Sequence, residues 1–85
     1  MKKVKVRYRK LGKEQSWGIY HPSKNLIEID ERLKGKRLLG TQVHEALHLT
    51  FPELTEEKVV EAEKIMIEVL WTAIKAKEKH DTNPG

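Results

Sequence analysis

The chain begins with a segment in which apolar and basic residues alternate. From Val4 to Arg9 the order is Val-Lys-Val-Arg-Tyr-Arg, and a period of two is typical of a half-buried strand. We expect Val4, Val6 and Tyr8 to face a core, with the basic residues between them in water. A basic strand face can bind acidic partners, but it also protects an edge from aggregation, which is the simpler interpretation.

Two further short apolar segments flank a turn. Trp17–Tyr20 and Leu26–Asp30 have the length and composition of strands, and the Pro and Asn between them are typical of a tight connection. We therefore expect these two strands to form a hairpin. Residues 11–16, which are mostly polar, are expected to form a loop, and His21, in the turn, is expected at the surface.

The period then changes to that of a helix, beginning near Gly35 or Lys36 and ending before Pro52, which cannot continue the hydrogen-bond ladder. His44 and His48 fall on a different face from the apolar residues, so the helix can bury one side and present both histidines to a cleft. The apolar stripe consists of Leu39, Val43, Ala46, Leu47 and Thr50.

A second helix is expected after Thr55, a good N-cap, with Glu56 and Glu57 placed favourably in its first turn. Its expected core-facing stripe contains Val59, Val60, Ala62, Met66, Val69, Leu70, Ala73 and Ile74. Polarity rises toward the end of the chain. We expect one domain over residues 1–78, a disordered tail over residues 79–85, and an α+β fold with a small three-stranded, mostly antiparallel sheet packed on two helices.

Composition limits the classes of site. With 85 residues the chain is long enough for one small core, and a bound metal would help to stabilise it. There is no cysteine, which excludes disulfides and thiolate zinc sites. No apolar run approaches the roughly 18 residues of a membrane span, and the charged start does not resemble a signal peptide. We expect a cytoplasmic protein without a membrane partner.

The sequence His44-Glu45-Ala46-Leu47-His48 places two imidazoles four residues apart, with a carboxylate directly after the first. Residues i and i+4 lie on one face of a helix, so both rings can reach a common ion. Two neutral imidazoles are good ligands for Zn²⁺. Glu45 is then suitably placed to act as general base on a zinc-activated water.

A third protein ligand is needed, because catalytic zinc commonly has three protein ligands and one open position. At about 100° per residue, Glu56 and Glu63 both fall inside the apolar stripe of the second helix, where an unpaired carboxylate is costly. We favour Glu56, which follows the first helix across a short turn. Glu63 is the alternative ligand, or a group that accepts a hydrogen bond from a histidine ring. Glu57 is a further alternative.

The segment Val43–His48 resembles the active-site helix of zincin metallopeptidases, and a glutamate on the following helix resembles the gluzincin arrangement. The likeness covers roughly residues 17 to 71 and extends to minimal zincin-like proteins of phages and bacteria. It departs from metzincins at Leu54, where they have a third histidine. It also departs from thermolysin-like enzymes at Val60, where they have an aspartate.

The expected function is zinc-dependent hydrolysis of a peptide bond. The expected metal ligands are His44, His48 and Glu56, and Glu45 is the expected general base. The substrate would be an extended peptide or protein that pairs with a strand edge of the hairpin. Tyr20 and His21 are candidates for donating a hydrogen bond to the reacting carbonyl. The alternative is a non-catalytic zinc-stabilised binding module, which could associate with nucleic acid through the basic first strand.

Overall fold

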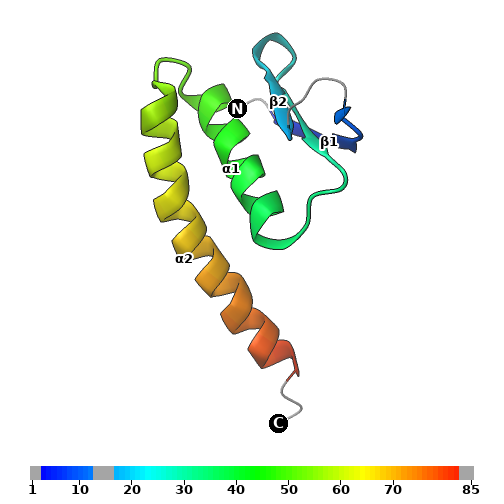
Figure 1. Cartoon of the computed structure of the whole chain (residues 1–85), viewed down its shortest axis with the longest axis vertical. Coiled ribbons are helices and arrows are strands. Elements are labelled where there is room, and N and C mark those ends of the chain that lie inside the picture. Colours follow the sequence, from blue (N-terminus) through cyan, green and yellow to red (C-terminus); the bar gives the residue numbers. More distant parts are fainter. Residues whose placement is uncertain (1–2, 13–16, 83–85) are drawn as a thin grey trace.

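The computed structural model describes residues 3–12 and 17–82, with side chains described up to residue 78. It has three strands and two helices, which confirms the predicted α+β class (Figure 1). The expected loop residues 13–16 and the tail residues 83–85 lie outside the described part. The elements are β1 (Lys5–Arg9), β2 (Gly18–His21), a 3₁₀ turn (Pro22–Lys24), β3 (Leu26–Asp30), α1 (Gly35–Thr50) and α2 (Glu56–Thr82).

The sheet has the strand order β1-β3-β2. The predicted hairpin is present, because β2 pairs antiparallel with β3, and Tyr20 lies opposite Ile27. The pairing of β1 with β3 is parallel, with Val6 opposite Ile27. The sheet is therefore mixed rather than mostly antiparallel, since β3 returns between the two earlier strands.

Helix α1 lies between the sheet and α2, and it contacts β2, β3 and α2 (Figure 1). The core between the sheet and α1 contains the buried residues Ile27, Ile29 and Leu33. The partly buried residues Tyr20, Leu38, Ala46 and Leu49 pack against these three. This core holds the histidine-bearing helix firmly against the hairpin.

The prediction that Val4, Val6 and Tyr8 face a core is wrong. Their exposed fractions are 49%, 46% and 51%. Strand β1 is at the edge of the sheet, whereas α1 covers β2 and β3. The Tyr8 hydroxyl reaches α1, where it donates a hydrogen bond to Gln42.

Helix α2 begins as predicted, because the backbone N–H of Lys58 donates to Oγ1 of Thr55 over 3.2 Å. It continues to Thr82, past the expected domain boundary at residue 78. Of the described helices, α2 included, none is long and apolar enough to cross a membrane.

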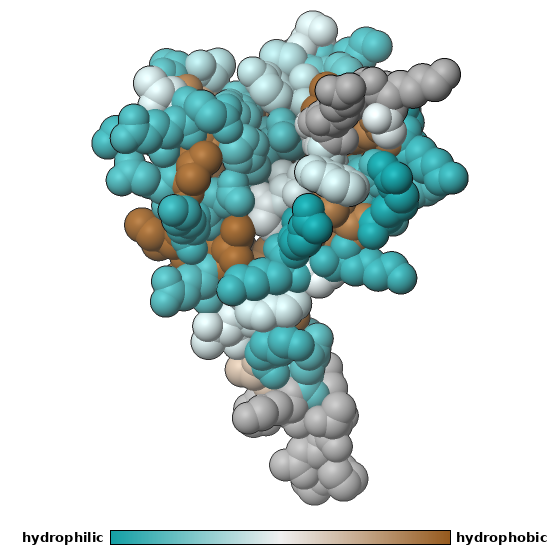
Figure 2. Space-filling model, in the orientation of Figure 1, coloured by the Kyte–Doolittle hydropathy of each residue, from teal (hydrophilic) through white to brown (hydrophobic). Residues whose placement is uncertain are grey.

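Much of the apolar stripe expected to be buried on α2 is exposed. Val59 is fully buried, but Met66 and Val69 are 42% and 64% exposed. The last turns of α2 extend beyond the start of α1, where no other element of the described structure covers them (Figure 1). Met66 and Val69 lie before this part, next to Ile67 and Glu68, which line a pocket with Lys36 of α1. Hydrophobic side chains interrupt the polar surface over the upper half of α2 (Figure 2).

Candidate metal centre

The two histidines of α1 lie side by side. Their Nε2 atoms are 3.2 Å apart, and the rings meet edge to face, with centroids 4.8 Å apart. The side chains of His44 and His48 are only 20% and 15% exposed. The i, i+4 spacing thus directs two ring nitrogens to one half-buried point.

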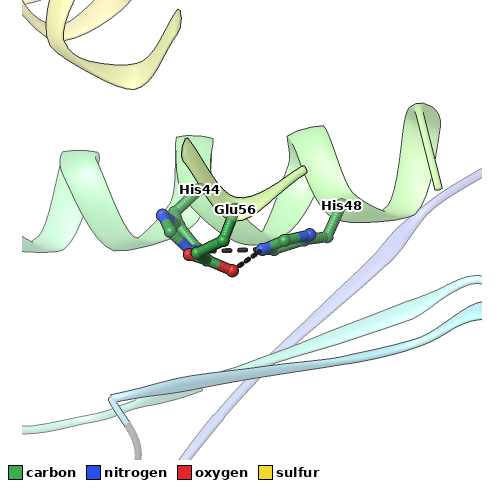
Figure 3. Close-up of side chains that lie close together, drawn as sticks. All are labelled: His44, His48 and Glu56. Carbon is green, nitrogen blue, oxygen red and sulfur yellow. Dashed lines mark hydrogen bonds and ion pairs between the residues drawn. The ribbon is translucent and has the colours of Figure 1, made fainter. Parts of the chain in front are cut away.

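Glu56, the first residue of α2, completes this group (Figure 3). Its Oε1 lies 2.7 Å from Nε2 of His44, and its Oε2 lies 3.0 Å from Nε2 of His48. The short turn between the helices brings this carboxylate to the end of the histidine pair. Glu56 is 66% exposed, so one side of the group is open to solvent.

Glu63 contacts the other nitrogen of the first ring. Its Oε1 lies 2.6 Å from Nδ1 of His44. With Nδ1 donating its proton to this carboxylate, the Nε2 lone pair of His44 points at the group formed with His48 and Glu56. Of the two glutamates that the sequence singled out, Glu56 faces both Nε2 atoms and Glu63 supports one ring from behind.

Electrostatics around His44 favour the protonated ring when no metal is bound. Burial by itself lowers the pKa of His44, but the hydrogen bond with Glu63 and the negative charges of Glu56, Glu63 and Glu45 outweigh it, so that the pKa is raised. The surroundings of this ring therefore favour positive charge.

Tyr20 of β2 positions the second ring. Its ring stacks on that of His48, with centroids 5.1 Å apart and planes inclined by 10°. Sequence reasoning proposed Tyr20 only as a hydrogen-bond donor and missed this contact. The alternation of residues along β2 indicates which side Tyr20 faces. Tyr20 pairs with core-facing Ile27, and it therefore faces α1 and its histidines.

Glu45 lies beside the histidine pair, between α1 and the start of β2, and is 9% exposed. Burial raises the pKa of its carboxyl, and Glu56 and Glu63 add to this, although His44 and His48 act in the opposite direction. A pocket of about 230 Å³ adjoins it. The pocket is lined by Trp17, Gly18, Thr41, His44, Glu45 and Glu63.

His21 belongs to a different cluster. Its Nε2 lies 2.8 Å from Oε1 of Glu28, on the sheet face that points away from α1. Arg9 donates from Nε to Oε2 of the same carboxylate over 2.7 Å. Hydrogen bonds from Arg9 and then His21 lower the pKa of Glu28 to about 2. His21 is therefore partly buried rather than plain surface, and it lies away from the His44–His48 pair.

The donor set suits zinc. Two imidazole nitrogens and a carboxylate are ligands that Zn²⁺ commonly takes. In a tetrahedron with bonds of about 2.05 Å, neighbouring ligand atoms are about 3.3 Å apart. The separation of 3.2 Å between the two Nε2 atoms is close to that value, and each of these atoms contacts a different oxygen of Glu56, at 2.7 and 3.0 Å. In the described part of the chain, these three residues are the group whose donor atoms all lie within 4.8 Å of one another.

Comparisons with protein-family models, with curated proteins and with solved structures find no match for this chain. Within the described residues, His44, His48 and Glu56 converge, while Glu63 contacts the ring of His44 on its opposite side.

Proposed function

We propose that this protein is a zinc-dependent peptide hydrolase, with His44, His48 and Glu56 as the protein ligands of the metal. The observation that carries this proposal is the approach of both Glu56 oxygens to the two Nε2 atoms, at 2.7 and 3.0 Å. Three protein donors leave a tetrahedral ion one position for water or substrate, which is the usual arrangement of catalytic rather than structural zinc.

Bound zinc would polarise the scissile carbonyl and lower the pKa of water to about 7. Glu45 would accept the proton of the attacking water and return it to the leaving amine nitrogen. Its burial supports this role, because burial raises the pKa of its carboxyl toward the range of an effective proton carrier. Glu63 would keep His44 in the tautomer that binds metal, and Tyr20 would hold the ring of His48.

The hairpin supports a peptide as substrate. Strand β2 is an edge strand of the sheet, and its first residue, Gly18, lines the pocket beside Glu45 together with the preceding Trp17. An extended peptide can add to such an edge through backbone hydrogen bonds. The same combination, an HExxH helix followed by a helix that carries a glutamate, is the basis of the resemblance to gluzincin peptidases.

The alternative is a zinc-stabilised module that binds a partner without cleaving it. It requires the same three ligands but gives no role to Glu45. A nucleic-acid partner at β1 receives less support, because Glu28 pairs with Arg9 and Arg7, at 2.7 and 3.7 Å. These ion pairs neutralise part of the basic sheet face.

The test compares the wild type with Glu45→Gln. Metal analysis after purification without chelator should find about one zinc per chain in both proteins. Cleavage of a mixed peptide library, followed by mass spectrometry, should fall by a factor of 10² or more in the variant. Zinc binding without cleavage in the wild type would favour the binding module, and absence of zinc from both proteins would contradict the metal centre.

A further inference from the structure

The pocket beside Glu45 continues as a groove along the two helices. A second pocket, of about 320 Å³, shares Thr41 and Glu63 with the first. A third, of about 370 Å³, shares Lys36 and Ile67 with the second. We call the second and third pockets together the α1–α2 groove. Its lining residues are Lys36, Arg37, Gly40, Thr41, Glu63, Lys64, Ile67 and Glu68.

Cations outnumber carboxylates in the lining of this groove. Lys36, Arg37 and Lys64 form no ion pair with a carboxylate in the described part of the chain, so their charges are available to a ligand. Of the two acidic groups, Glu63 is engaged with His44 at 2.6 Å. Glu63 keeps its negative charge when it accepts a hydrogen bond from a neutral imidazole, so three cations face two carboxylates, Glu63 and Glu68.

Arg37 is held where the groove meets the pocket beside Glu45. Its guanidinium carbon lies 5.2 Å from the centroid of the Trp17 ring, a cation–π contact. Trp17 lines the first pocket and Arg37 lines the second. The contact directs a positive charge toward the path that a bound peptide would follow.

The cations at the start of α1 oppose the stability of the helix. Its first turn has no acidic residue, and its N-cap residue Lys34 makes no side-chain capping bond. Positive charges are unfavourable at this end of a helix dipole. An anion in the groove would offset the repulsion among Lys34, Lys36 and Arg37.

We propose that the α1–α2 groove binds a carboxylate of the substrate, so that the preferred ligand is an acidic peptide. The inference that this peptide is a substrate rests on the proposed peptide hydrolase. Peptide binding itself requires only the groove. The carboxylate could come from an acidic side chain or from a free C-terminus, and the probes below separate these two sources.

The experiment uses the full chain carrying Glu45→Gln, loaded with zinc, so that bound peptides stay intact. Fluorescence anisotropy would measure the affinity for three labelled peptides of equal length. The first is rich in Asp and Glu with an amidated C-terminus, the second has Asn and Gln instead with the same amide, and the third is the neutral peptide with a free C-terminus. Each titration would be repeated at two salt concentrations.

We expect the acidic peptide, or the peptide with a free C-terminus, to bind at least tenfold more tightly than the neutral amide. Lys36→Gln combined with Arg37→Gln should remove that preference, and Lys36→Gln combined with Lys64→Gln should reduce it while keeping the Arg37–Trp17 contact. The matched control is Lys24→Gln, an exposed lysine in the 3₁₀ turn, which should leave binding unchanged. Circular dichroism would confirm that each variant is folded.

Equal binding of all three peptides, or a preference that survives both double variants, would overturn the inference. Metal analysis of the same samples keeps this outcome separate from the zinc centre. Zinc binding without a charge preference contradicts the groove alone. A charge preference in protein that binds no zinc supports the groove and contradicts the hydrolase.

Discussion

Nδ1 of His44 lies 2.6 Å from Oε1 of Glu63, across the interface between α1 and α2. This pairing connects the packing of the two helices to the chemistry of the ring. Val59 is fully buried in α2, one helical turn before Glu63. The same helix therefore supplies core packing, a candidate ligand at Glu56, and the group that fixes the orientation of His44.

The first prediction concerns Glu63→Ala. Loss of its carboxylate should weaken zinc binding by a factor of about 10–100, because an imidazole without a partner on its second nitrogen is poorly oriented and less basic. Glu63→Gln should weaken binding less, since its amide oxygen can still accept the Nδ1 proton. Competition with a chromogenic chelator would measure the affinities. Glu61→Gln, on an exposed part of α2, is the control and should bind zinc as the wild type does.

The second prediction concerns removal of the metal. A ligand at about 100 times its Kd stabilises the folded state by about 2.7 kcal/mol. For a domain of this size, that corresponds to a rise in Tm of roughly 10–20 °C. Treatment with EDTA should remove the rise, and zinc should restore it. Calorimetry with and without zinc is the measurement.

Single histidine variants test which residues are needed for the rise in Tm with zinc. His44→Ala and His48→Ala should show no rise in Tm with zinc. His21→Ala should retain the rise, because His21 contacts Glu28 on the sheet face away from α1. An equal loss in all three variants would indicate nonspecific binding by histidines rather than a centre on α1.

The local parts of this architecture follow from sequence periodicity. The hairpin, both helix starts and the Thr55 cap depend on residues close together in the chain, and the structure has all of them. A period also shows which residues share a face, but not whether another element covers that face. Val6 on β1 and Val69 on α2 were expected to be buried for this reason, and they are 46% and 64% exposed.

The candidate site, like the fold, could be predicted from the sequence only in its local features. Helical spacing placed Glu56 and Glu63 on the side of α2 that faces the histidines. It could not determine which ring nitrogen each carboxylate meets, because that depends on the distance and crossing angle of α1 and α2. The stacking of Tyr20 on His48 likewise depends on how the hairpin lies against α1.

The third prediction concerns acid stability. The pKa of Glu28 is about 2 in the folded protein, against an ordinary value of 4.5, mainly because of its hydrogen bonds with Arg9 and His21. A lowered pKa means that the unfolded state binds protons first, so the stabilisation is complete above about pH 4.5 and is lost as the pH falls toward 2. Urea titrations at several pH values should show the free energy of unfolding falling through this window.

Glu28→Gln should reduce the fall in the free energy of unfolding between pH 4.5 and 2 without abolishing it. Part of the fall should remain, because Asp30 also has a lowered pKa, caused mainly by its hydrogen bond with Arg32. The variant should be less stable by about 1.5–3 kcal/mol at pH 7, since the charged acceptor of the hydrogen bonds from Arg9 and His21 is lost. Zinc affinity should be unaffected. An unchanged slope between pH 4.5 and 2 would contradict the role assigned to the contacts of Glu28.

The fourth prediction concerns Gly18→Ala. A Cβ at this position would lie 2.8 Å from both Cγ of Glu45 and Cγ2 of Thr41, closer than carbon atoms normally approach. Because Glu45 is 9% exposed, its side chain cannot move aside freely. We expect a loss of stability of about 1–3 kcal/mol and a displaced Glu45. In a protein that cleaves peptides, kcat should fall while zinc content stays the same.

Gly12→Ala is the matched control for this variant. Its new Cβ would have its nearest neighbour, Nη2 of Arg32, at 4.0 Å, so stability should change by no more than about 0.5 kcal/mol. Thermal unfolding and zinc content should be measured for both glycine variants together with cleavage. If Gly18→Ala retained full turnover and wild-type stability, the close packing of β2 on Glu45 would not position this proposed general base. The role of Glu45 would then depend on α1 alone.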